Sequence, residues 1–133
     1  MSRILSYLAG LLVGMIVAIA LMLGVELFGS VVHPLPTDFG GTMAAMCEHV
    51  AQYPQWVLAV VTIVWPMAAF ASTWTANRIG GRAARLTIGL MLTLGLLFNI
   101  TKLPYVVWFK TAIVPLVVAA IALALRPSSS NRN

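Results

Sequence analysis

The chain has 133 residues, of which 61% are hydrophobic and only 8% are charged, and its mean hydropathy is +0.98. Soluble domains average about 25% charged residues, so this composition excludes an ordinary soluble protein and indicates an integral membrane protein of one domain. The net charge of +5 predicts contact with anionic membrane lipids rather than nucleic acid, because the arginines form no basic helix or stripe.

Four apolar segments are long enough to cross a bilayer, which takes about 20 residues in a helix. Trp56 and Trp74 bound the second segment and are predicted to anchor it at the two interfaces. We therefore predict an all-α fold, an integral membrane four-helix transmembrane bundle that forms one domain over residues 1–133 and ends in a disordered tail, 127–133. The predicted spans are residues 4–25, 56–76, 86–103 and 106–125.

The charged residues sort to alternate sides of these spans. The arginines precede the first span, separate the second from the third and follow the fourth, whereas the three acidic residues all lie between the first and second spans. Basic residues in short loops stay in the cytoplasm. The sequence therefore predicts a multi-pass protein of the bacterial inner membrane with both termini inside (N-in/C-in). The arginines are Arg3, Arg78, Arg82, Arg85, Arg126 and Arg132, and the acidic residues are Glu26, Asp38 and Glu48.

The segment 27–55 is the one long connection and is predicted to form a cap outside the membrane. Its first half contains two prolines and a double glycine, which favour an irregular, extended chain. Its second half has helical spacing, with apolar residues on one side and Glu48 and Gln52 on another. We expect a short extracytoplasmic amphipathic helix between the first two spans, lying at the membrane interface and ended by Pro54.

Small residues recur at every fourth position within the first two spans. Such rows let helix backbones approach closely in lipid. We expect them to pack helices of the same chain against each other rather than to build a dimer. The rows are Gly10, Gly14 and Ala18 in the first span, and Ala68, Ser72 and Ala76 in the second.

Candidate functional residues gather at the predicted outer side. Glu26, at the end of the first span, is expected either to pair with a lysine near the outer end of the last two spans or to face lipid head groups. Histidines and carboxylates could also hold a divalent metal, but Glu48 and His49 are adjacent on a helix and point about 100° apart. The candidates are Glu26, His33, Asp38, Glu48, His49, Lys102 and Lys110.

No spacing in the sequence pairs a nucleophile with a base, so we predict no catalytic residue, no bound metal and no cofactor. The single cysteine, Cys47, cannot form a disulfide within the chain.

The chain combines a glutamate that ends the first span, a proline pair, an amphipathic helix that closes in Tyr-Pro, a second span with small residues, a loop of arginine and glycine, and a Pro-x-x-x-Trp-Phe turn. This combination resembles a family of small four-helix bacterial inner-membrane proteins with no assigned function. The likeness covers nearly the whole chain through short motifs. In that family a histidine often follows the first-span glutamate by four residues and another stands beside the late proline, where this chain has Ser30 and Tyr105. The resemblance thus implies the topology but no activity and no histidine metal site. The matching residues are Glu26, Pro34, Pro36, Pro54, Gly80, Gly81, Pro104, Trp108 and Phe109.

Three classes of function stay open at this point. The first is a structural or accessory membrane protein that binds a lipid, a protein partner or a second copy of itself, which fits the scarcity of polar residues inside the spans. The second is a small transporter or channel subunit, which would need a polar pathway. The third is a membrane enzyme or metal site built from the outer Glu/His cluster.

Overall fold

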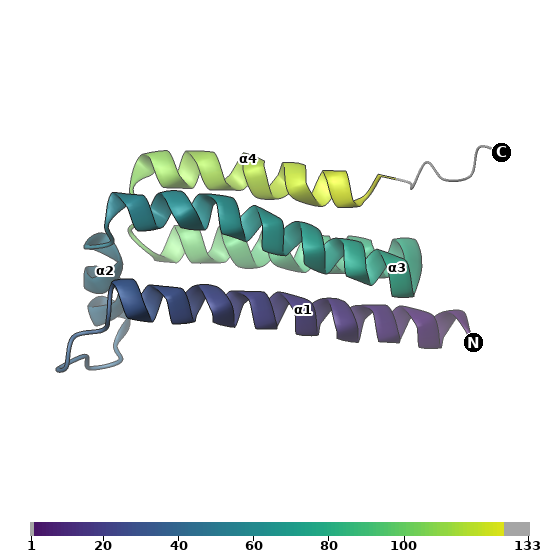
Figure 1. The fold of residues 1–133 in the computed structure, drawn as a ribbon, viewed down its shortest axis with the longest axis horizontal. Coiled ribbons are helices and arrows are strands. Elements are labelled where there is room, and N and C mark those ends of the chain that lie inside the picture. The colour runs from purple at the N-terminus through teal and green to yellow at the C-terminus, as the bar shows by residue number, and fades with distance from the viewer. Residues whose placement is uncertain (1, 127–133) are drawn as a thin grey trace.

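The computed structural model describes residues 2–126 and shows an all-α protein of four helices (Figure 1). The predicted disordered tail, 127–133, lies outside the described residues. Three of the helices are long and apolar enough to cross a membrane. The helices are α1 (Arg3–Val32), α2 (Met43–Ala51), α3 (Gln55–Lys102) and α4 (Val107–Ala124).

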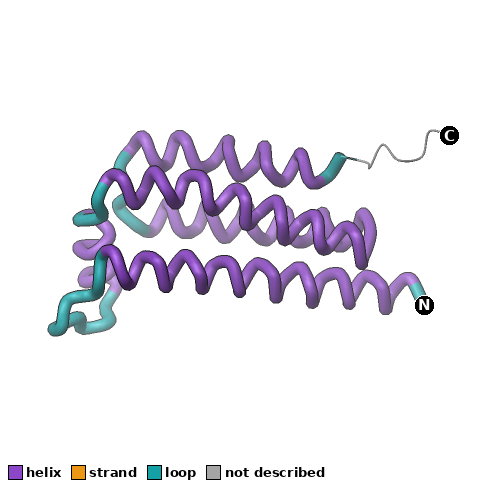
Figure 2. Tube along the Cα trace, in the orientation of Figure 1, coloured by secondary structure: helices purple, strands orange, loops and turns teal. Residues whose placement is uncertain are grey.

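The 48-residue α3 folds back on itself at Gly81, where the backbone leaves the helical region with φ 71° and ψ −159°. A residue with a side chain rarely adopts this conformation, whereas glycine does so without steric cost. The reversal gives two helical arms, 55–80 and 82–102, which pack side by side (Figures 1 and 2). The interval between the predicted second and third spans, residues 77–85, therefore contains one non-helical residue.

α1 extends seven residues beyond the predicted end of the first span, to Val32. The chain leaves the helix at His33, with φ −144° and ψ 71°, because the proline that follows disfavours a helical conformation in the residue before it. The prediction that the irregular cap begins at residue 27 is wrong for this reason. The extended part of the cap is shorter and leads into α2, which ends close to the predicted place.

The two rows of small residues pack against each other, as predicted. A Cβ placed on Gly14 would lie 2.9 Å from the Ala76 Cβ and 3.3 Å from the Ser72 carbonyl oxygen. Near the chain reversal, Gly10 lies even closer to Gly80. Both contacts are within one chain, so the rows hold α1 against the first arm of α3.

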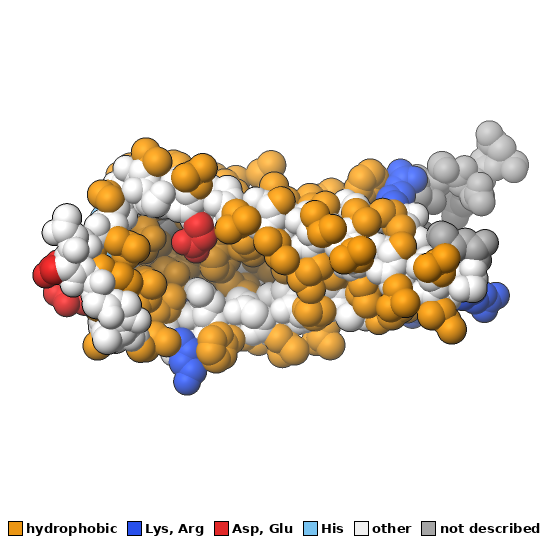
Figure 3. Space-filling view, turned by 90° about the horizontal axis from the view of Figure 1, so that it is seen from below, with side chains coloured by type: hydrophobic (Ala, Val, Ile, Leu, Met, Phe, Trp, Pro, Cys, Tyr) orange, Lys and Arg blue, Asp and Glu red, His pale blue; other side chains and the backbone are white. Residues whose placement is uncertain are grey.

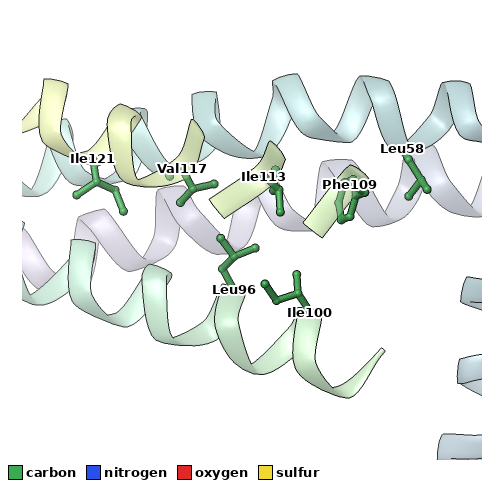
Figure 4. Packing of buried hydrophobic residues seen from close by; sticks show 8 residues of the cluster. Leu58, Leu96, Ile100, Phe109, Ile113, Val117 and Ile121 are labelled. Atoms are coloured by element: carbon green, nitrogen blue, oxygen red, sulfur yellow. The ribbon is translucent and has the colours of Figure 1, made fainter. Parts of the chain in front are cut away.

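A second contact joins α4 to both arms of α3 through larger side chains. Phe109 and Ile113 of α4 are fully buried and pack with Leu96 and Ile100 of the second arm and Leu58 of the first (Figure 4). α1 contributes no residue to this cluster. The bundle is thus held by two separate contacts, a close one between small residues and a broader one between large apolar residues.

The outer surface of the bundle is strongly apolar (Figure 3). Large side chains such as Leu12, Ile63 and Phe98 are more than 60% exposed, which would be costly in water and is expected in lipid. Together with the three long apolar helices, these side chains indicate a multi-pass membrane protein.

The two ends of the bundle differ in charge, since the described arginines lie at one end and the acidic residues, with Lys102 and Lys110, lie toward the other. The start of α1, the reversal at Gly81 and the end of α4 lie at one end, and α2 lies at the other (Figure 1). The first end, called the arginine end below, therefore collects Arg3, Arg78, Arg82, Arg85 and Arg126, while Asp38 and Glu48 lie at the α2 end.

Candidate functional site

A cavity opens between α1 and α3 where the close contact of small residues stops. α1 buries only Gly10, Gly14 and Ala18. The next two members of this four-residue row are Met22 and Glu26, and both line a cavity of about 250 Å³. The row changes from small to long side chains at this point, so the two helix backbones no longer approach closely. The sequence of one helix face therefore sets where the cavity begins.

The cavity adjoins a second one of about 280 Å³ that lies under α2. Glu26, Trp65 and Asn99 line both, and the two are called the Glu26 cavity below. Met46 and Val50 on the apolar side of α2 line its outer part. α2 thus covers this end of the bundle with its apolar side.

Two buried polar atoms in the lining of this cavity have no hydrogen-bond partner among the described residues. They are the indole nitrogen Nε1 of Trp65 and the amide oxygen Oδ1 of Asn99. An unsatisfied buried polar group costs about 1–3 kcal/mol, and most native structures avoid it. Trp65 and Asn99 both line this largely apolar cavity, and each therefore carries a buried polar atom without a partner among the described residues.

Glu26 adds a carboxylate to this lining, with two tyrosines on the same side of the molecule. Glu26, Tyr53 and Tyr105 line the outer part of the Glu26 cavity. Burial raises the pKa of Tyr105 to about 12, and the charges of Tyr53 and Glu26 contribute to this rise. Burial, followed by the charge of Glu26, also raises the pKa of Tyr53. Both phenols therefore stay protonated at neutral pH and keep an O–H donor near the carboxylate.

The two histidines pack together where α2 meets the end of α1. Their rings stack with centroids 4.4 Å apart, and Tyr53 packs against both. The Nε2 of His33 lies 3.2 Å from the backbone oxygen of His49. Burial lowers the pKa of His49, and the nearby charge of His33 lowers it further. The pair thus attaches α2 to α1, and the sequence did not predict this contact.

The structure divides the predicted outer cluster into separate parts. Glu26 and Lys102 line the same cavity, but among the described residues no ion pair joins Glu26 to a lysine. The Lys102 ammonium instead lies over the Phe98 ring, 5.9 Å from its centroid. Asp38 and Glu48 are exposed and line neither part of the Glu26 cavity. Lys110 is also absent from its lining.

Metal binding gains no support from this arrangement. In the part of the chain that the structure describes, no group of three or more histidine, cysteine or acidic side chains could hold an ion. Cys47 is a free thiol, and its sulfur lies 3.8 Å from the backbone oxygen of Lys102.

Trp65 is the functional candidate that the sequence did not suggest. A tryptophan inside an apolar span gives no signal by itself, since only the folded structure shows that its N–H lacks a partner. Asn99 carried a stronger signal, because a buried amide in a membrane span is expensive without a hydrogen bond. Tyr53 lies just after α2 and Tyr105 between α3 and α4, and their position beside Glu26 is a result of the tertiary fold.

Comparison with known proteins adds no assignment: no family model, no curated protein and no solved structure matches the chain.

Proposed function

We propose that the chain is a four-span protein of the bacterial inner membrane, with both termini in the cytoplasm. The two arms of α3 would cross separately, and α1 and α4 would be the other spans. The segregation of arginines to one end of the bundle supports this orientation, because short basic loops stay in the cytoplasm. The α2 end would then face outward.

Within that topology, we propose that the protein is an accessory membrane protein that binds a lipid in the Glu26 cavity. The observation that carries this proposal is that two residues lining a largely apolar cavity hold unpartnered buried polar atoms, Trp65 Nε1 and Asn99 Oδ1. A ligand that supplies one acceptor and one donor would remove both penalties at once.

The rest of the lining agrees with a ligand that has an apolar tail. The deeper part of the cavity is lined by Met22, Met91, Leu92 and Leu96, which favour hydrocarbon. Met91 is 47% exposed, so the cavity reaches the lipid-facing surface of the bundle. The hollow on this face is visible in Figure 3. A membrane lipid could enter from the side without crossing a polar barrier.

The ligand head group would lie near the wider, more polar part of the cavity. Glu26 and Asn99 Oδ1 are acceptors there, and Trp65 Nε1 is a donor. A head group with hydroxyl or protonated amine donors and at least one oxygen acceptor satisfies all of them. The other classes predicted from the sequence, a transporter or channel subunit and a membrane enzyme, gain no comparable observation from the described residues.

The test measures which lipids stay bound to the protein after purification in a mild neutral detergent. Trp65→Phe removes the indole N–H and leaves a smaller aromatic ring, and Asn99→Leu removes the amide and leaves an apolar side chain of similar size. Native mass spectrometry should show a bound lipid on the wild type and about fivefold weaker retention on each variant, the value of one ordinary hydrogen bond.

Thr101→Val is the matched control. Thr101 is exposed on the arm of α3 that carries Asn99, and its hydroxyl donates only to backbone oxygens of its own helix. Its lipid retention should equal that of the wild type. Equal retention by all the variants would contradict the proposal. A stoichiometric protein in place of the lipid would identify a protein partner instead.

A further inference from the structure

A second recess lies at the arginine end, the end of the bundle opposite α2. It has a volume of about 740 Å³ and is formed by the start of α1 and the chain reversal in α3. Arg3, Arg78 and Arg82 line it, together with the polar side chains of Ser6 and Asn77. Three guanidinium groups from two helices therefore surround one recess.

The sequence explains why these arginines come together. Arg3 and Gly10 are seven residues apart in α1, which is close to two helical turns, so they share a face. Gly10 lies so close to Gly80 that a methyl group added to Gly10 would be only 2.5 Å from the Gly80 Cα. This close approach places the first turns of α1 beside the reversal, whose flanks carry Arg78 and Arg82.

No acidic side chain is available to neutralise the charges of Arg3, Arg78 and Arg82. All the acidic side chains of the chain lie from residue 26 to residue 48, in the outer part of α1, the cap and α2, so no aspartate or glutamate can pair with them. Arg85 is different, because its NH1 donates to the backbone oxygen of Leu125 at 2.8 Å and so ties α4 to α3. Arg78 stacks on Trp74, with its guanidinium carbon 4.8 Å from the ring centroid, which orients the group but leaves its N–H edges available.

The lining of the recess favours one class of anion. Guanidinium groups bind phosphate oxygens through paired N–H donors. Ile4 and Ile79 also line the recess, and Ile4 is 72% exposed, so an apolar surface continues from the phosphate position along the bundle. A soluble phosphate compound would leave that apolar surface uncovered, whereas the acyl chain of a phospholipid would pack against it.

We infer that the recess at the arginine end binds the phosphate head group of an anionic phospholipid. In the topology proposed above, this end of the bundle lies on the cytoplasmic side. Basic pockets between membrane helices on that side are suited to such head groups. The site is independent of the Glu26 cavity and shares no lining residue with it. A bound phospholipid would bridge α1 and the α3 reversal across their closest contact.

The experiment titrates the purified protein in neutral detergent with phosphatidylglycerol, phosphatidylcholine of the same chain length, or inorganic phosphate, and follows binding by native mass spectrometry at low salt. Phosphatidylglycerol should bind more tightly than phosphatidylcholine. Arg78→Gln and Arg82→Gln should each weaken its binding about fivefold, and Arg82→Lys should weaken it less, because it keeps the charge.

Arg126→Gln is the matched control, since it removes one charge from the same end but Arg126 does not line the recess. Its affinity for phosphatidylglycerol should stay within about twofold of the wild type, because a charge outside the recess acts only through the screened field. An equal loss in Arg126→Gln and Arg82→Gln would overturn the inference, because it would show attraction by net charge alone. Equal binding of both lipids would overturn it as well, and so would inorganic phosphate that competes phosphatidylglycerol off at similar concentration.

Discussion

The close contact between α1 and α3 leads to a quantitative prediction for Gly10→Ala. A methyl group at this position would lie 2.5 Å from the Cα and N of Gly80 and 2.9 Å from the Ala76 carbonyl oxygen. All three are backbone atoms, which cannot rotate away as a side chain could. The methyl group can be accommodated only if α1 and the first arm of α3 move apart.

The magnitude follows from two opposing effects. Alanine in place of glycine inside a helix gains about 0.5–1 kcal/mol of stability, while overpacking a close contact costs about 1–3 kcal/mol. Because the obstruction is backbone, the cost belongs at the upper end of that range, and Gly10→Ala should lose about 2 kcal/mol. Gly24, in the same helix, has no atom within 4 Å of the position that an added methyl group would take. Gly24→Ala should therefore keep the gain of about 0.5–1 kcal/mol.

The assay is unfolding in mixed micelles of a mild detergent and increasing SDS, followed by helical circular dichroism. The two variants change the sequence in the same way within one helix, so their difference of about 3 kcal/mol isolates the contact with Gly80. If Gly10→Ala were as stable as the wild type, the reasoning would be refuted. Destabilisation of both variants by the same amount would point to a general effect of glycine loss in α1.

Three further predictions concern the α2 end. For topology, Thr37→Cys in a chain without the native cysteine should react with an impermeant maleimide in intact cells, and Ala83→Cys only in opened membranes. For electrostatics, Glu26→Gln and Lys102→Met should cost about 0.5 kcal/mol less together than the sum of their separate effects, because both line one cavity. For pH, the pKa of His49 is lower in the folded protein than its ordinary value of 6.5, so the unfolded chain binds the proton more readily. The melting temperature should therefore be highest above pH 6.5 and fall as the pH drops below that value.

The charge and pH predictions each have a control variant, and the topology prediction has an outcome that would contradict it. Lys110→Met should be additive with Glu26→Gln, since Lys110 does not line the cavity, and equal coupling to both lysines would indicate only long-range charge effects. His49→Phe should weaken the pH dependence while keeping a ring to stack on His33, and an unchanged dependence would assign it to another group. Labelling of Ala83→Cys in intact cells would reverse the proposed orientation.

Local patterns in the sequence were sufficient to predict the long helices and the small-residue contact between α1 and α3. The rows of small residues identified both faces that meet between α1 and α3, because small side chains at four-residue intervals have few other roles in lipid. Gly80 and Gly81 lie between the second and third predicted spans, where the chain must reverse, but the sequence does not show that Gly81 alone provides the reversal. Such features are encoded within a few residues of one another, so they can be read without the fold.

The end of α1 and the cavity could not be read in the same way. Glu26 looked like the boundary of the first span, because a charge usually marks the edge of the hydrocarbon. Helical backbone does not depend on hydrophobicity, however, and α1 continues until Pro34 prevents it. The position of Trp65 beside Asn99 depends on how two arms of α3 and α1 are arranged, and no local spacing predicts that arrangement.

The cavity also has a physical meaning that differs from that of a cavity in a soluble protein. Lipid chains are as apolar as the helix faces, so nothing drives membrane helices to close an apolar gap. Acyl chains would fill the part of the Glu26 cavity near Met91 whatever the protein does. Selectivity must then come from the polar atoms that hydrocarbon cannot satisfy, Trp65 Nε1 and Asn99 Oδ1. If the site is specific, its specificity lies in these atoms and in Glu26, and an apolar substitution there should convert a selective site into an ordinary lipid contact without disturbing the bundle.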